Sequence, residues 1–208
     1  MPAAAIRNAL VCAALLACVS LCLGWADTWD DIRRTAGTVT SVQTDFTQTK
    51  QLPILTHPLV SKGRLYYQQP GSLRWEYLTP IHSILVMHDG RVRRFTEDTR
   101  THAFREESGA GLDAMQVVFE EISQWMGGRF EDNPMFDARL EPPRKIVLTP
   151  KQPSFAKILQ RIELFLDEQP GVIREVLIVE DENAFSKLSF SGTVINQTIN
   201  ADLFRNAP

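Results

Sequence analysis

The stretch GRLYYQQPGSLRWEYLTP, Gly63 to Pro80, sets the architecture of this chain together with SILVMHDGRV, Ser83 to Val92. It contains three runs typical of short strands, residues 63–68, 72–78 and 83–88, with turn residues between them. Side chains alternate between the two faces of a strand, and one face collects large apolar side chains: Leu65, Tyr67, Leu73, Trp75 and Tyr77. We therefore predict a sheet with one apolar face and one solvent-exposed face.

The first 26 residues have the pattern of a signal peptide. Arg7 supplies a short positive region, an apolar run extends from Ala9 to Leu23, and Gly24 and Ala26 are small residues at the positions that signal peptidase reads. We predict cleavage after Ala26, which makes residues 1–26 a signal peptide and residues 27–208 one exported domain.

The alternative for this leader is a lipoprotein anchored through Cys18, because the sequence Leu15-Leu16-Ala17-Cys18 partly resembles a lipobox. Two features oppose it. Leu16 is bulky at a position that is usually small or β-branched, and a new N-terminus at Cys18 would leave an apolar tether from Val19 to Trp25.

Composition excludes several classes of protein. All three cysteines lie in the leader, so the mature chain has neither disulfides nor thiolate metal sites. Its 182 residues (208 less 26) are enough for one domain that buries about 70% of its unfolded surface. Removal of Arg7 leaves 21 of the 22 Lys and Arg residues against 25 Asp and Glu, a formal charge of −4, which argues against nucleic acid as a partner.

The remaining pattern predicts a mainly β protein with helices. Alternation continues through residues 41–52, and further short strands follow at regular spacing, about ten or eleven in all. Connections this short favour a single antiparallel sheet, and so long a sheet curls. A loop is expected over residues 97–112.

Two helices have apolar faces that need a partner. Thr28 begins the first, and Trp29 and Ile32 share one of its faces. The second, residues 113–126, has a wider apolar face: Met115, Val118, Phe119, Ile122, Trp125 and Met126. The concave side of the curled sheet is the natural place for both. The apolar residues between sheet and helices form either an ordinary core or the wall of a cavity, and composition alone leaves both open.

No sequence motif indicates catalysis, a metal or a cofactor. The chain has no GxSxG elbow, HExxH pair or P-loop. Gly109 to Ala114 matches a loose GxGxxA pattern but follows no predicted strand, and His82 and His88 are expected to be surface or turn histidines. We therefore expect a protein that is not an enzyme.

Several stretches, taken in order, resemble the LolA family of periplasmic carriers of outer-membrane lipoproteins. They are Phe46-Thr47-Gln48-Thr49-Lys50, Gly63-Arg64-Leu65, Pro70 with Leu73-Arg74-Trp75, Pro80 with Ile84-Leu85-Val86, Asp89-Gly90, Val147 to Lys151, and Phe204. The resemblance implies an incomplete, strongly curved antiparallel β-barrel with helices as a lid over a hydrophobic cavity.

It also implies a function, a location and a set of site residues. The protein would bind the acyl chains of lipoproteins in the periplasm, receive them from an inner-membrane ATP-binding-cassette releasing complex, and pass them as a monomer to an outer-membrane receptor. The lipid-binding residues would be Phe46, Leu65, Tyr67, Leu73, Trp75, Leu85, Met87, Met115, Phe119, Ile122 and Trp125, with Trp29, Ile32 and Gln69 in the lid.

The chain departs from the family pattern at Gln69. The family often has a basic residue there, before the proline of the PxxxRW segment, that holds the lid closed. The departure leaves two alternatives besides the lipoprotein carrier: an outer-membrane receptor of the same fold anchored through Cys18, or a carrier of another lipid such as a polyene or a glycolipid.

Overall fold

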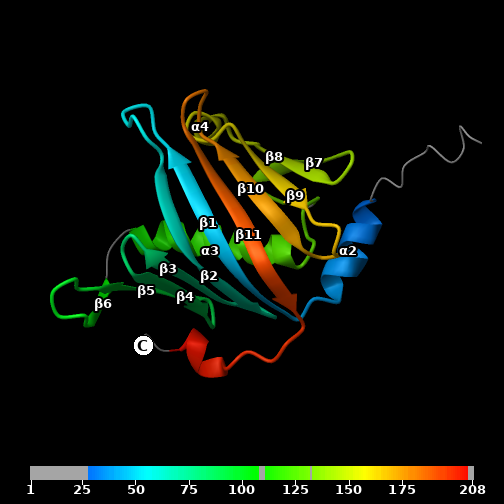
Figure 1. Cartoon of the computed structure of the whole chain (residues 1–208). Coiled ribbons are helices and arrows are strands. Elements are labelled where there is room, and N and C mark those ends of the chain that lie inside the picture. The colour runs from blue at the N-terminus through cyan, green and yellow to red at the C-terminus, as the bar shows by residue number, and fades with distance from the viewer. Residues whose placement is uncertain (1–27, 108–110, 132, 206–208) are drawn as a thin grey trace, which may run out of the picture.

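A single antiparallel sheet forms most of the molecule (Figure 1). The computed structural model describes residues 28–107, 111–131 and 133–205, so the predicted signal peptide and Cys18 lie outside it. Within the described residues the sheet has eleven strands in the order β6-β5-β4-β3-β2-β1-β11-β10-β9-β8-β7. Their bounds are β1 (Ser41–Gln51), β2 (Leu59–Gln68), β3 (Ser72–Thr79), β4 (Ser83–His88), β5 (Arg91–Glu97), β6 (Phe104–Glu107), β7 (Phe136–Glu141), β8 (Lys145–Pro150), β9 (Arg161–Leu166), β10 (Ile173–Val179) and β11 (Phe185–Ile195).

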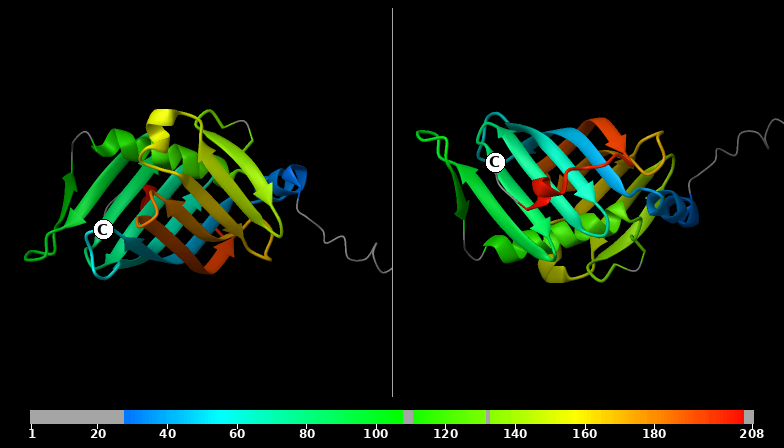
Figure 2. Two further views of the ribbon diagram at one scale, coloured as in Figure 1. Left: turned by 90° about the horizontal axis from the view of Figure 1, so that it is seen from above. Right: turned by 90° about the horizontal axis from the view of Figure 1, so that it is seen from below.

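The strand order explains why a helix crosses the open side of the sheet. Strands β1 to β6 form one meander and β7 to β11 form another, and the two join in the middle where β1 pairs with β11. The edge strands β6 and β7 are therefore consecutive in the chain but lie at opposite ends of the curled sheet. The helix α3 (Gly111–Met126) connects them and runs across the concave side, as Figure 2 shows.

A second helix, α2 (Trp29–Gly37), lies beside the C-terminal end of α3. Its first turn is fixed by a capping box, in which the Thr28 side chain accepts from the Asp31 backbone and the Asp31 side chain accepts from the Thr28 backbone. The ring of Trp29 packs 6.0 Å from that of Phe130, just after α3. A short helix, α4 (Pro153–Ala156), and a 3-10 helix, η1 (Ala201–Phe204), complete the described elements.

The inner face of the sheet holds the main core. Phe46 on β1 lies opposite Gly63 on β2, and its ring takes the space of the missing side chain. A Cβ atom at position 63 would lie 2.5 Å from that ring and 2.0 Å from the carbonyl oxygen of Glu76, so only glycine fits. The Phe46 ring then packs on Trp75, with 4.8 Å between ring centroids, and meets Tyr77 edge-on at 5.3 Å.

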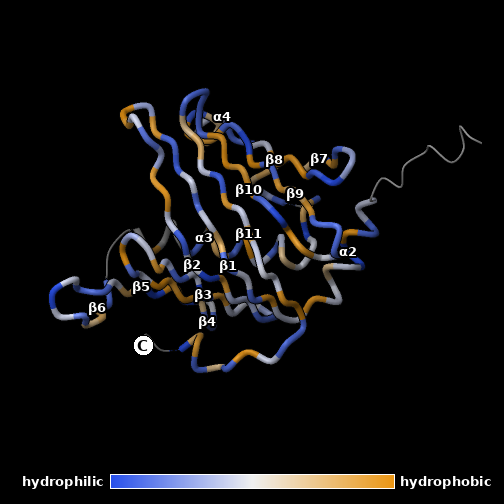
Figure 3. The backbone as a smooth tube through the Cα atoms, in the orientation of Figure 1, coloured by the Kyte–Doolittle hydropathy of each residue, from blue (hydrophilic) through white to orange (hydrophobic). Residues whose placement is uncertain are grey.

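The predicted fold class is confirmed: the protein is mainly β, with one unclosed antiparallel sheet and few short helices. The expected loop over residues 97–112 is wrong in part, because it contains β6. This strand has no apolar alternation and is held by cross-strand ion pairs, Arg93 with Glu106 and Arg94 with Glu107. Figure 3 shows the hydrophilic character of this hairpin. In addition, β2 begins at Leu59 rather than at Gly63.

The prediction of a solvent-exposed outer face is wrong over β3, β4 and β5. The segment after β11 folds back under these strands and ends in η1 (Figure 1). Its residues form a second core with outward-facing residues of β4 and β5: Ile84, Val86, Phe95, Ile199 and Phe204. The run SILVMH in β4 indicates this arrangement, because an unbroken apolar strand is typical of burial on both faces.

Candidate ligand-binding cavity

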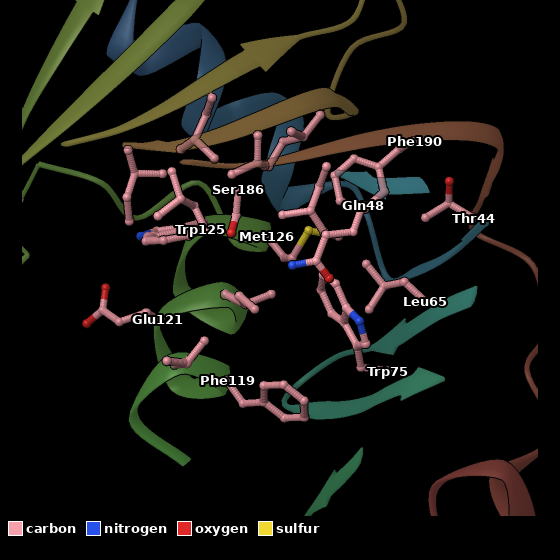
Figure 4. A pocket seen from close by; sticks show the side chains of 18 of the residues that line it. Thr44, Gln48, Leu65, Trp75, Phe119, Glu121, Trp125, Met126, Ser186 and Phe190 are labelled. Atoms are coloured by element: carbon pink, nitrogen blue, oxygen red, sulfur yellow. The ribbon is translucent and has the colours of Figure 1, made fainter. Parts of the chain in front are cut away.

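A cavity of about 560 Å³ lies between α3 and the concave face of the sheet. Figure 4 shows Phe119, Trp125 and Met126 extending from α3 on one side of it and Leu65 and Trp75 on the sheet opposite. Strands from both meanders contribute to its wall, which is mainly apolar. A concave, apolar site with few polar groups is the usual form of a small-molecule or lipid site.

The residues predicted to bind lipid fall into two groups. Six of them line the cavity: Leu65, Trp75, Leu85, Phe119, Ile122 and Trp125. Four others are buried behind this wall and do not line it: Phe46, Tyr67, Leu73 and Met87. They share a strand face with the lining residues, which is why strand alternation alone could not separate them. The side chain of Met115 lies outside the described part of the chain.

Sequence reasoning missed the half of the wall that comes from the second meander. These residues are Met135, Phe136, Phe155, Leu159, Ile162, Leu164, Val172, Ile173, Val176, Ile178, Leu188 and Phe190. Alternation within residues 162–166 and 172–179 predicts strands for part of this set, including Ile162, Leu164 and Val176. Their approach to α3 depends on the pairing of β11 with β1, which alternation does not specify.

The three predicted lid residues lie near α2 rather than over the main cavity. Ile32 lines a smaller cavity of about 130 Å³ next to α2, whereas Trp29 packs on Phe130. Gln69 donates from Nε2 to the carbonyl oxygen of Val39 at 2.7 Å, and its backbone N–H donates to the carbonyl oxygen of Thr40 at 2.9 Å. Gln69 therefore fixes the segment that links α2 to β1.

Two residues of α3 separate the cavities. Trp125 and Met126 line both the main cavity and the smaller one, and so does the segment Gly171 to Ile173 on the opposite side. The two cavities are therefore neighbours divided by the last turn of α3.

A few polar groups interrupt the apolar wall. The hydroxyl of Tyr77 donates to Oε1 of Gln48 at 2.8 Å. Burial raises the pKa of Tyr77, against smaller opposing effects of the neighbouring Trp75 side chain and the Arg94 charge, so this hydroxyl is a donor at neutral pH. On α3, the buried Glu121 accepts from Nδ2 of Asn133 at 2.5 Å.

Two donors at the cavity have no acceptor. The Nε1 atoms of Trp75 and Trp125 are buried and make no hydrogen bond within the described chain. Neither tryptophan could be assigned this property from sequence, because it depends on which acceptors the fold brings near.

The described residues offer no alternative site for a metal ion. Three or more His, Cys, Asp or Glu side chains grouped as a metal requires are not found among residues 28–107, 111–131 and 133–205. In that part of the chain no helix is long and apolar enough to cross a membrane.

Comparison with models of protein families finds a match over most of the chain. The family model described as "Outer membrane lipoprotein carrier protein LolA" matches residues 37–207. A comparison with curated proteins finds no match.

Among solved structures, an uncharacterized conserved protein from Thermus thermophilus is similar with a TM-score of 0.50 and 12% identity, over 86% of this chain and 91% of that chain. A LolA superfamily protein from Nitrosomonas europaea has a TM-score of 0.40 and 9% identity, over 86% and 98%. MucB of Pseudomonas aeruginosa, in complex with MucA, has a TM-score of 0.48 and 15% identity, over 86% of this chain and 60% of that chain. At these identities the likeness extends to the fold alone.

Proposed function

Because the chain belongs to the LolA family of outer membrane lipoprotein carrier proteins, we propose that its cavity holds the acyl chains of lipoproteins while they cross the periplasm. The observation that supports this most directly is the apolar cavity of about 560 Å³ between α3 and the sheet. Its wall is mainly apolar, which is what a site for acyl chains requires.

The energetics suit a carrier that must also release its cargo. Burial of an acyl chain contributes about 0.8 kcal/mol per methylene, so part of one chain already gives several kcal/mol of gross affinity. Phe119, Ile122 and Trp125 of α3 pack against the sheet core. Cargo has to replace these contacts, which reduces the net affinity and allows transfer.

The proposal includes the location and partners that the family implies. The signal peptide is cleaved after Ala26, and the mature domain works in the periplasm as a monomer. It receives lipoproteins from an inner-membrane ATP-binding-cassette complex and passes them to an outer-membrane receptor. Intact-mass measurement of the mature protein tests the first step, because an unmodified N-terminus at Asp27 rejects a Cys18 anchor.

A filled-cavity variant tests the binding site. Val176 on β10 lines the cavity, and Val176→Trp places an indole in the space of several methylenes. Loss of two or more methylene contacts lowers affinity for an acyl probe by about tenfold or more. Val194→Trp on β11 is the matched control, because Val194 is 38% exposed and does not line the cavity. Equal affinity of the two variants for a fluorescent fatty-acid probe would reject this cavity as the site.

A further inference from the structure

We propose that the tip of the β1–β2 hairpin, residues 52–60, and the neighbouring β3–β4 turn insert into the surface of an anionic lipid bilayer and dock the protein there. This inference goes beyond the proposed carriage of acyl chains, and it holds or fails independently of that function. It assigns a membrane contact to residues that lie outside both cavities.

The first observation is a set of large apolar side chains exposed at one end of the sheet. The hairpin and the turn adjoin each other, because Lys62 on β2 pairs with Thr79 at the end of β3. Their exposed apolar residues, which we call the apolar tip, are Ile54 (86% exposed), Leu59, Val60, Leu78 and Ile81 (57% exposed). Figure 3 shows hydrophobic residues at the end of this hairpin. Grouped exposed apolar residues mark a contact with a protein or a membrane, whereas scattered single ones do not.

The second observation is the charge around the apolar tip, which favours a lipid surface. Residues 46–88 contain a single acidic residue, Glu76, and its carboxylate is paired with Arg74. Lys62 and His57 are exposed within the apolar tip region. This stretch is therefore basic in a chain whose formal charge is −3. Anionic headgroups attract exposed basic side chains, and apolar side chains beside them enter the acyl boundary, so an anionic bilayer complements both features.

An acidic loop at the same end of the sheet sets the orientation. The β10–β11 loop, residues 180–184, begins with three consecutive acidic residues, and Glu180 pairs with Lys50 at 3.2 Å. In the strand order, β11 adjoins β1 on one side and β2 adjoins it on the other. The acidic loop and the β3–β4 turn therefore lie on opposite sides of β1. Because an anionic surface repels the loop, we expect the protein to tilt, with the apolar tip in the lipid and the loop held away from it.

The apolar tip continues the wall of the main cavity. Leu59 lies directly opposite Lys50 in the β1–β2 ladder, and residues that oppose each other in antiparallel strands share a face. Lys50 lines the cavity, so Leu59 extends the same face of the sheet beyond it. A bilayer that holds the apolar tip therefore lies beside the cavity, where an apolar ligand could pass between the two with little exposure to water.

A single fluorescent label tests insertion. Residues 27–208 contain no cysteine, so Ile54→Cys, Ile81→Cys and Ile158→Cys each accept one environment-sensitive nitrobenzoxadiazole group. Vesicles of phosphatidylethanolamine with phosphatidylglycerol should brighten the labels at positions 54 and 81, and spin-labelled lipid should quench them. The label at position 158 is the matched control and should not respond. Ile158 is also exposed, but it lies between β8 and β9, beyond the acidic loop.

Flotation of the unlabelled mature protein with the same vesicles is the second measurement. Ile54→Ser removes an apolar side chain from the lipid and should lower the partition coefficient by about tenfold. Lys62→Glu reverses a charge at the surface and should lower it by about fivefold or more. Ile158→Ser is the control and should leave it unchanged. None of the three residues lines the main cavity, so affinity for an acyl probe should stay at the wild-type value in each variant.

The outcomes separate this inference from the proposed function. Unchanged labels at positions 54 and 81 would overturn it and leave a protein partner as the occupant of the apolar tip, and equal flotation of Ile54→Ser and wild type would also overturn it. Brightening at position 54 with rising protein concentration and no vesicles would assign the apolar tip to a second copy of the chain instead. Acyl-probe binding would leave the carrier function standing in all these cases. Vesicle binding without acyl-probe binding would reject the carrier function and support this inference.

Discussion

Arg74 and Glu76 form an ion pair under the C-terminal segment, on the outer face of β3. Arg74 is 3% exposed and donates from Nε to Glu76 at 3.0 Å and from an Nη atom to the carbonyl oxygen of Leu203 at 3.1 Å. His82 contacts the other Glu76 oxygen at 2.9 Å. Burial alone would raise the pKa of Glu76, but the hydrogen bonds from Arg74 and His82 outweigh it and the pKa is lowered.

This ion pair should make the free energy of unfolding depend on pH. Because the pKa of Glu76 is lower in the folded protein, its carboxylate stabilises the fold fully above the unfolded pKa of about 4.3, and the contribution is lost as pH falls through the folded value. Glu76→Gln should lower the free energy of unfolding at pH 7 by about 1–3 kcal/mol. The variant should then lose less further stability than the wild type between about pH 5 and pH 3. Urea unfolding across this range measures both effects.

Glu120→Gln is the control for this prediction. Glu120 is an exposed residue of α3, and its substitution should change the free energy of unfolding by no more than about 0.5 kcal/mol. If Glu76→Gln and wild type showed parallel pH profiles, the ion pair would not be a source of the acid sensitivity.

The two helices meet at Gly128, just after α3. Gly128 has a φ of +72°, and a Cβ atom there would lie 2.8 Å from the Cβ of Ala36 and 3.1 Å from the Cα of Arg33, both on α2. The absence of a side chain therefore lets α2 pack closely on the end of α3. Ala36 also lines the smaller cavity, so the contact lies next to it.

Gly128→Ala should separate the helices and destabilise the protein. The positive φ costs about 1–2 kcal/mol for alanine, and the clash with α2 adds to it. Gly90→Ala is the matched control, since Gly90 has a similar φ of +70° with nothing within 4 Å. The difference in free energy of unfolding between the two variants reports the helix contact. Equal values would show that α2 does not depend on close packing at Gly128.

Local patterns in the sequence predict only part of the fold and of the cavity. Residues 113–126 have an apolar face because a helix that crosses a concave sheet must bury one side, so α3 and its cavity contacts Phe119, Ile122 and Trp125 could be predicted. Strand alternation placed Leu65 and Trp75 on the inner face but also Tyr67 and Leu73, which the cavity does not reach. The outer core around Phe204 depends on where the C-terminal segment folds back, which local patterns do not encode.

At the scale of the entire protein, the two cavities lie side by side and are separated by the last turn of α3. The main cavity is enclosed where the meanders curl toward α3, and the smaller one lies where α2 covers the end of the second meander. Trp125 and Met126 stand between them. If the main cavity holds acyl chains, as proposed, the length of acyl chain that binds should depend on this boundary as well as on the main cavity.

Removal of this boundary should shift binding toward longer acyl chains. Trp125→Ala joins the smaller cavity of about 130 Å³ to the main one, whereas Phe119→Ala enlarges the main cavity alone. Each truncation should lower the free energy of unfolding by about 3–5 kcal/mol. The two variants are therefore matched in their effect on stability. Two acyl probes that share one carbonyl head and differ by about four methylenes cancel any change at the head in their affinity ratio. At about 0.8 kcal/mol per methylene, the preference for the longer probe should rise about tenfold or more in Trp125→Ala only. The same ratio in both variants would show that the cargo never passes Trp125.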